Sequence, residues 1–211
     1  MNSMARVPVD MCILFVDMNR MTHKMRLQRC ALLLAVTALA IGASCKNDST
    51  GPTTDPGNLI SNPSFELNDK PSYAGWHFAD AADTAVSDDV PTLGGSWSLR
   101  MHPDWLPIPY ARAYITGESG RRVYTLSVWV KTANLPEPAR IACGILQPDR
   151  TLRNEVHVNI SGTDWSQYSL QDTLDLTATD TLVVELSPGA AQVVPIDALA
   201  LFDLVRLQRV F

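Results

Sequence analysis

The 211-residue sequence has no excess of basic residues and no long hydrophobic run. Its 17 Lys and Arg residues are outnumbered by 22 Asp and Glu residues, and this balance excludes the large basic surface of a nucleic-acid-binding protein. The longest uncharged apolar run, residues 31–42, is too short for a membrane-spanning helix, which needs about 20 residues. The hydrophobic fraction of 46% is ordinary for a globular protein, so one domain, or two small ones, can be built.

Motifs of common catalytic sites are also missing. The sequence contains no Gly-x-Ser-x-Gly nucleophile elbow, no phosphate-binding loop and no His-Glu-x-x-His zinc motif. The histidines after residue 44 are His77, His102 and His157, and their spacings indicate no preformed metal site. The sequence therefore favours a non-enzyme, although a glycosidase needs only two facing carboxylates and would escape such a search.

The amino-terminal 44 residues have the pattern of an export signal. The basic segment Met25–Arg29 precedes the apolar run, and small residues then lead to Cys45, which resembles the lipobox of bacterial lipoproteins. We predict a lipoprotein signal peptide at residues 25–44, lipidation at Cys45 and a flexible tether at residues 45–57. The alternative is a plain secretory signal with an accidental cysteine, because Gly42 replaces the usual Leu or Val of the lipobox.

Three further expectations concern this amino-terminal part. Residues 1–24 do not fit a signal peptide, and we expect them to be an extension that precedes the true start of translation. Lys46 follows the lipobox cysteine and favours the outer membrane or the cell surface over the inner membrane. If Cys45 carries lipid, Cys143 has no disulfide partner, and its apolar neighbours predict a buried packing residue rather than a nucleophile.

Residues 58–211 read as a strand-rich domain. Short alternating runs are separated by turn residues, and the clearest run is Val123–Lys131. Similar patterns occur at Glu155–Ile160 and Trp97–His102, while residues 181–186 and 199–207 are more uniformly apolar. Nine or ten short strands with even spacing predict an all-β fold, a single β-sandwich or jelly roll.

Six segments in this order resemble the carbohydrate-binding modules of families four, nine and twenty-two, which have a galactose-binding-like jelly roll. The segments are Asn58–Glu66, Gly75–Trp76, Gly94–Leu99, Tyr124–Lys131, Asp164–Tyr168 and Phe202–Leu207. The resemblance covers essentially the whole of residues 58–211. It implies non-catalytic binding of a polysaccharide or oligosaccharide. Separately, we expect a monomer that contacts the membrane only through its lipid anchor.

The resemblance also implies a structural Ca²⁺ between the first and last strands. Glu66 and Asp203 stand at the matching positions, and Ca²⁺ prefers carboxylate and carbonyl oxygens. Leu204 stands where the family usually has a second Asp. The alternative is that Glu66 and Asp203 are ordinary polar strand residues.

The glycan platform of these modules is the concave face of one sheet, built from aromatic and planar polar side chains. Trp129 is the first candidate because it shares the polar side of its strand with Ser127 and Lys131. Its alternative role is packing under a loop, under the tether or between layers. Other candidate ligand contacts are His157 and Asn159 on a second strand, Gln147 near a turn, Trp76, and the loop residues Trp105 and Tyr110. The alternatives are solvated strand residues for His157 and Asn159, a cap on the end of the sandwich for Trp105, and packing for Trp76, which the family resemblance favours.

Two functions remain open on this evidence. The first is glycan binding by an exported, lipid-anchored envelope protein. The second is a structural or interaction lipoprotein that keeps the jelly roll, binds no sugar and docks to another envelope protein. An exposed Trp129 favours the first, and a covered one favours the second.

Overall fold

The computed structural model describes residues 57–79, 84–104, 108–190 and 193–210. The predicted extension, signal peptide and Cys45, the tether up to residue 56, and Trp105 lie outside these ranges. In the described ranges no helix is long and apolar enough to cross a membrane. The secondary structure is all β, with these strands: β1 (Glu66–Leu67), β2 (Lys70–Pro71), β3 (Trp76–Phe78), β4 (Thr84–Ser87), β5 (Ser98–Met101), β6 (Ala111–Ile115), β7 (Gly120–Ala133), β8 (Ala139–Leu146), β9 (Leu152–Ile160), β10 (Ser166–Leu176), β11 (Leu182–Ser187) and β12 (Leu199–Val210).

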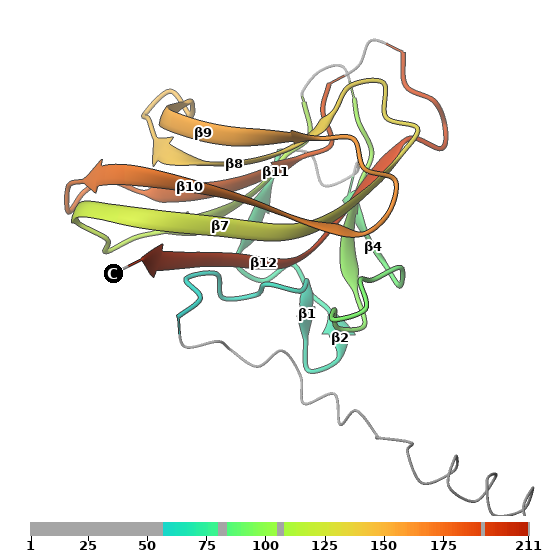
Figure 1. Ribbon diagram of the computed structural model, residues 1–211, viewed down its shortest axis with the longest axis horizontal. Helices are drawn as coiled ribbons and strands as arrows, with labels where there is room; N and C mark the ends of the chain where they lie inside the picture. The colour runs from blue at the N-terminus through green and yellow to red at the C-terminus, as the bar shows by residue number, and fades with distance from the viewer. Residues whose placement is uncertain (1–56, 80–83, 105–107, 191–192, 211) are drawn as a thin grey trace, which may run out of the picture. The chain divides into compact units, whose positions relative to one another are not determined.

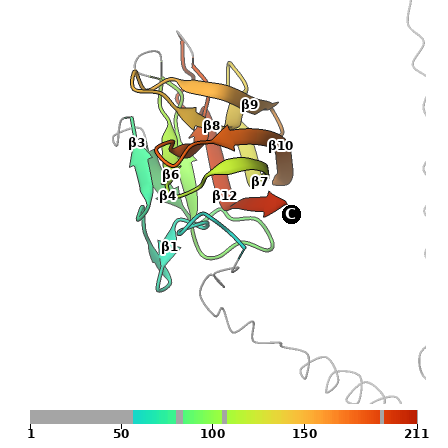
Figure 2. The ribbon, with the colours of Figure 1, turned by 90° about the vertical axis from the view of Figure 1, so that its left-hand side faces the viewer.

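Two five-stranded antiparallel sheets form a sandwich (Figures 1 and 2). One has the order β10-β7-β12-β5-β4, and we call it the β7 sheet. The other has the order β3-β6-β11-β8-β9, and we call it the β11 sheet. Strands β1 and β2 form a separate two-stranded hairpin. The predicted all-β sandwich is therefore confirmed for the described residues.

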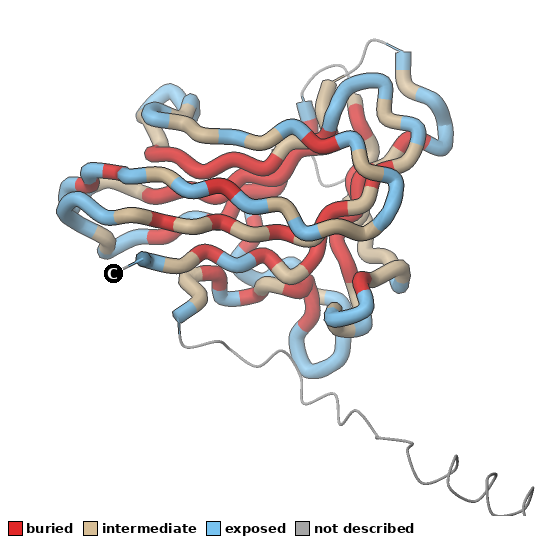
Figure 3. The backbone as a smooth tube through the Cα atoms, viewed as in Figure 1, coloured by how far each residue is buried: buried red, intermediate tan, exposed pale blue. Residues whose placement is uncertain are grey.

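The core lies between the two sheets because apolar side chains alternate with polar ones along the strands. On β7 the residues Tyr124, Leu126, Val128 and Val130 are all buried, as their alternation predicts. Figure 3 shows the same alternation as buried and exposed segments along the strands. The β11 sheet supplies the opposite half of the core from Ile141, Cys143, Ile145, Leu182, Val184 and Leu186.

Cys143 is a packing residue, as its apolar neighbours predict. It is a free cysteine and fully buried. Burial, with a smaller contribution from the charge of Asp172, raises the pKa of its thiol to about 12. A thiol with this pKa stays protonated and unreactive near neutral pH.

The segment before β1 lies along the last strand, where β12 carries a bulge between Asp203 and Arg206. Val205 N donates to Pro63 O at 2.9 Å, and Leu59 N donates to Leu207 O at 2.8 Å. The side-chain amide of Asn58 donates to Val205 O at 3.0 Å. These bonds hold the start of the domain against its end and form one wall of a pocket described below.

Candidate functional site

The candidate ligand residues fall on two different faces of the sandwich. His157 and Asn159 lie on β9, and Tyr110 directly precedes β6, so all three belong to the β11 sheet. Trp129 lies on β7, in the opposite sheet. The structure therefore does not bring Trp129 together with His157 and Asn159 in one site.

The outer face of the β11 sheet carries a row of residues across all five strands. In register, His77 is opposite Arg112, Arg112 is opposite Glu185, Glu185 is opposite Ala142, and Ala142 is opposite His157. Directly opposed residues in a sheet point to the same face. The row thus places His77, Arg112 and Glu185 next to one another and His157 beyond Ala142, and we call this surface the β11 face.

A buried ion pair lies at the centre of the β11 face. Arg112 Nη2 lies 2.6 Å from Glu185 Oε2, and Arg112 Nε donates to the same oxygen at 2.8 Å. Burial alone would lower the pKa of Arg112, but the hydrogen bond and charge of Glu185 raise it above its usual value. Arg140 lies 3.5 Å from the other oxygen of Glu185 and 2.6 Å from Glu155. The pair is therefore fixed from both sides.

Aromatic rings flank this ion pair. The guanidinium carbon of Arg112 lies 4.2 Å from the centroid of the Tyr110 ring, a cation–π distance. The rings of His77 and Tyr114 lie 4.8 Å apart at 50°, and Tyr114 is 36% exposed. His157 is also exposed and lies 3.1 Å from Glu155. Exposed aromatics with planar polar groups beside them are suited to a ligand that has both apolar faces and hydroxyl groups.

Small residues lie at the middle of the β11 face. Ala142, Gly144 and Val183 are buried although they share the outward side of their strands with Arg140 and Glu185. The β8–β9 loop crosses toward them, because Arg112 Nη1 donates to Arg150 O at 3.0 Å. The centre of the face is thus low and closely packed, and the exposed residues Tyr114, His77, His157 and Asn159 stand around it.

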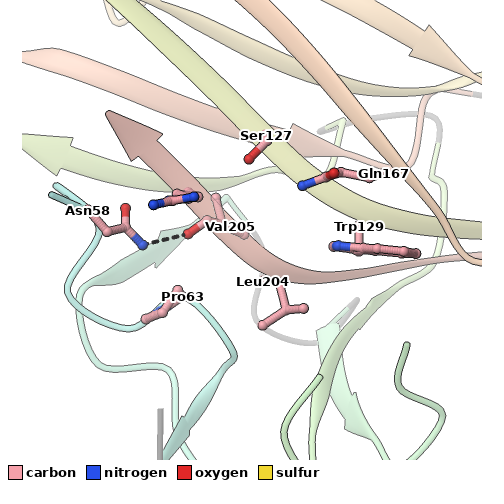
Figure 4. A pocket seen from close by; sticks show the side chains of 8 residues that line it. Asn58, Pro63, Ser127, Trp129, Gln167, Leu204 and Val205 are labelled. Atoms are coloured by element: carbon pink, nitrogen blue, oxygen red, sulfur yellow. Dashed lines mark hydrogen bonds between the residues drawn. The ribbon is translucent and has the colours of Figure 1, made fainter. Parts of the chain in front are cut away.

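Trp129 lies on the outer face of the β7 sheet and is half-buried there. It lines an open pocket of about 290 Å³ (Figure 4). Ser127 comes from the same strand, and Gln167 is its direct neighbour on β10. The full lining consists of Asn58, Pro63, Ser127, Trp129, Gln167, Leu204, Val205 and Arg206. We call this site the Trp129 pocket.

Glu66 and Asp203, the predicted Ca²⁺ ligands, do lie together. Asp203 is fully buried and Glu66 nearly so. Burial raises the pKa of Asp203 to about 8, the backbone N–H of Leu204 opposes this, and the charge of Glu66 raises it further. Such repulsion requires the two carboxylates to be close neighbours.

The surroundings of this pair fit a cation. Asp203 Oδ2 is buried without a hydrogen-bond partner, whereas Oδ1 accepts from Leu204 N at 2.7 Å. A Cβ atom on Gly94 would collide with Asp203 Oδ2, and one on Gly95 would collide with the Glu66 carboxylate. Among the described residues no group of three or more His, Cys, Asp or Glu side chains is placed to hold a metal ion. Two carboxylates would therefore need backbone carbonyls and water as further ligands, which Ca²⁺ accepts.

The remaining predicted contacts have other positions. Trp76 is only 6% exposed, packs 5.0 Å from the Phe65 ring and donates its indole N–H to Asn62 O at 2.8 Å. This burial removes Trp76 from the ligand contacts and makes it a core residue. Gln147 lines a different pocket of about 570 Å³ beside Arg153 and Asp180, at the end of the β11 sheet.

The sequence interpretation missed several residues of these surfaces. Arg112 and Tyr114 alternate with the buried residues Ala111, Ala113 and Ile115, so the period of two in this short strand was the available signal. Glu185 had no such signal, because β11 is buried on both sides and its sequence is therefore mostly apolar, without a clear period of two. Gln167 becomes notable only through its register with Trp129.

No family model matches the chain, and no curated protein matches it. Among solved structures, a family 16 carbohydrate-binding module shares 18% identity over 71% of this chain and 99% of the module, with a TM-score of 0.53. A family 61 module in complex with β-1,4-galactotriose shares 18% identity over 72% of this chain and 99% of the module, with a TM-score of 0.50. The chain has the jelly-roll fold of carbohydrate-binding modules. The enzymatically active domain of tailspike protein 4 from bacteriophage CBA120 shares 17% identity over 72% of this chain, with a TM-score of 0.52, and the chain spans only 21% of its length.

Proposed function

We propose that this protein is a non-catalytic carbohydrate-binding protein and that its β11 face holds the glycan. The observation that carries the proposal is the arrangement of that face: exposed aromatic rings stand beside a fixed Arg112–Glu185 pair. A pyranose ring presents a C–H face and equatorial hydroxyls. Tyr114 and His77 would contact the former, and the more exposed polar groups beside the pair, on Arg140, Glu155 and Asn159, would hydrogen-bond the latter.

The fold supports this choice of ligand. The family 61 module with the same jelly roll was solved with β-1,4-galactotriose bound. Because fold alone does not determine function, the argument for this chain rests on its own side chains. The site includes three residues that the sequence interpretation selected, Tyr110, His157 and Asn159.

We further propose that the chain acts outside the cytoplasm as a monomer on a lipid anchor. Cys45 would carry the lipid, and residues 45–57 would hold the sandwich away from the headgroups of the outer membrane or at the cell surface. A protein placed in this way would retain polysaccharide at the envelope. Radiolabelled palmitate incorporation that disappears in Cys45→Ser is the expected result for this anchor.

A structural Ca²⁺ at Glu66 and Asp203 completes the proposal. The unpartnered Asp203 Oδ2 and the Gly94–Gly95 backbone that approaches the carboxylates support it. When bound, Ca²⁺ would neutralise the two acidic groups and join β12 to the segment around β1. Its role is stability, since both carboxylates are buried away from the β11 face.

Glycan arrays followed by calorimetry test the main proposal. The purified protein, with Ca²⁺ present, is expected to bind one class of glycan, and Tyr114→Ala and His157→Ala are each expected to weaken binding about ten-fold. A ten-fold loss corresponds to about 1.4 kcal/mol, which is within the range of one aromatic contact. Leu93→Ala is the control, because Leu93 is 74% exposed and belongs to a turn before β5. Unchanged binding in both Tyr114→Ala and His157→Ala contradicts the placement on the β11 face.

One observation favours docking to another protein as a second candidate function. Val193 and Ile196 are 82% and 98% exposed in the loop between β11 and β12, and Ile108 is 45% exposed in the loop before β6. A bridge between Asp104 and Ala190 holds these two loops side by side. Val193→Ser with Ile196→Ser would abolish capture of an envelope protein if docking is the function, and would leave glycan binding unchanged.

A further inference from the structure

The Trp129 pocket lies on the sheet opposite the β11 face. Figure 4 shows Trp129 and Asn58 on opposite sides of it, with Ser127 and Gln167 along one border and Leu204 and Pro63 along the other. The β12 bulge and the segment before β1 build the second wall, through the bonds of Asn58 and Pro63 to Val205. The walls are therefore set by backbone pairing.

Asn58 and Arg206 of this pocket have partners, whereas three other polar groups, on Ser127, Trp129 and Gln167, make no hydrogen bond within the described part of the chain. The Gln167 amide and the Ser127 hydroxyl make no hydrogen bond to other described residues. The indole N–H of the half-buried Trp129 makes none either. By contrast, Trp76 donates to Asn62 O and Trp165 donates to Asp89 at 2.8 Å.

We propose that the Trp129 pocket is a second carbohydrate site, separate from the β11 face, that takes a neutral sugar unit. An aromatic face with an amide and a hydroxyl beside it matches a pyranose ring, since the amide supplies both donors and acceptors to neighbouring hydroxyls. The volume of about 290 Å³ is at the small end for ligand sites, which suits one or two sugar units.

Two sites on opposite sheets would change what the protein does. One domain would hold two glycan chains, or two parts of one chain, and binding to a polysaccharide would gain from multivalency. The proposal shares the ligand class of the proposed function but not its residues. Each can therefore fail without the other.

NMR of the ¹⁵N-labelled protein, in Ca²⁺, separates the two sites. The probes are β-1,4-galactotriose, cellohexaose and xylohexaose, each added alone at millimolar concentration. The Trp129 indole signal is assigned by its loss in Trp129→Phe. At least one probe is expected to shift this signal together with the side-chain amide of Gln167, while the Trp165 indole, which is bonded to Asp89, stays in place.

A matched pair of variants on β10 provides the control. Gln167→Ala is expected to weaken the probe affinity, measured from the Trp129 shift, by about three- to ten-fold. This is the usual value of one or two hydrogen bonds to a neutral ligand. Gln171→Ala removes the same side chain from the same face of the same strand, but its amide bonds Thr125 outside the pocket, and binding is expected to be unchanged.

The outcomes are distinct. Shifts at Tyr114 and His157 with none at Trp129 for every probe overturn the second site and leave the proposed function standing. Shifts at Trp129 with none on the β11 face support the second site and overturn the placement of the first. A Trp129 shift that Gln167→Ala and Gln171→Ala weaken equally also overturns the second site.

Discussion

The two sheets each carry one buried carboxylate on the outward side of a central strand, and the two carboxylates are satisfied in opposite ways. Glu185 in the β11 sheet lies between Arg112 and Arg140. Asp203 in the β7 sheet has one backbone donor, an unpartnered Oδ2 and a second acid, Glu66, as its neighbour. The charge of Glu185 is balanced by arginines of the protein itself. The pair of Asp203 and Glu66 has no such partner and requires a proton or a cation from the solvent.

This difference separates an ion pair that keeps its own geometry from the pair of acids that we propose binds Ca²⁺. An internal ion pair holds its geometry at any calcium concentration, which suits a ligand face. A pair of buried acids near Gly94 and Gly95 is unfavourable until a positive charge arrives. Four changes test this contrast, in order of decreasing expected effect, with the pH dependence counted per pH unit.

Replacing Arg112, the cation that pairs with Glu185, has the largest expected effect on stability. Arg112→Leu leaves Glu185 buried without its nearest partner, and breaking a buried pair in this way costs about 3–5 kcal/mol of unfolding free energy. Urea denaturation followed by tryptophan fluorescence measures the loss. The double variant Arg112→Leu with Glu185→Leu should recover most of the stability, because the unpaired charge is gone. A loss below about 1 kcal/mol in the single variant would contradict the contrast.

Adding Ca²⁺ to the site of Glu66 and Asp203 has the next largest expected effect on stability. At 100 times its dissociation constant, Ca²⁺ that binds only the folded state stabilises it by about 2.7 kcal/mol. Thermal unfolding with Ca²⁺ and with chelator measures this, and Glu66→Gln should abolish the difference. Glu155→Gln is the matched control, since Glu155 pairs with Arg140 in the other sheet. An equal calcium response in Glu66→Gln and the native chain is the result that disproves the site.

Without Ca²⁺, the site of Glu66 and Asp203 should make the free energy of unfolding depend on pH. The pKa of Asp203 is about 8 in the folded protein, above its usual 3.8, so between these values the folded state keeps a proton that the unfolded state has released. This contribution is fully present below about pH 4 and is lost as the pH rises through 8, at no more than about 1.4 kcal/mol per pH unit. Asp203→Asn in chelator should remove the decline between pH 5 and 8. A decline that persists in Asp203→Asn would assign it to other groups.

The smallest effect is expected at an exposed ion pair. Arg153 lies 2.7 Å from Asp180 at the edge of the β11 sheet. Arg153→Ala should leave the free energy of unfolding nearly unchanged, since water screens such pairs. Denaturation in the same buffer as for Arg112→Leu gives the comparison. Similar losses in the two variants would show that burial does not distinguish them.

The sequence predicted the strands well where alternation was long. Val123–Lys131 became the middle of β7, with the expected residues inside, and Glu155–Ile160 became most of β9. The described residues form twelve strands rather than nine or ten, partly because β1 and β2 have two residues each and show no period. The β-sandwich was predictable from the apolar alternation and the even spacing of turn residues, because each strand buries one of its two sides.

The candidate site was predicted only in part. Tyr110, His157 and Asn159 share one sheet, but Trp129 lies on the other and Trp76 is buried. Alternation shows that a side chain points outward without showing which of two sheets its strand joins. For Trp76 the family resemblance favoured packing over ligand contact, and Trp76 does lie in the core.

The sequence by itself determined the alternation that makes this chain a β-sandwich and the proximity of Glu66 to Asp203 that the family resemblance implied. Only the tertiary structure decided which strands are neighbours. The register of the strands placed Arg112 beside Glu185, which is 73 residues away in the sequence, and Gln167 beside Trp129. These pairings depend on long-range strand order, which the local period of two cannot encode.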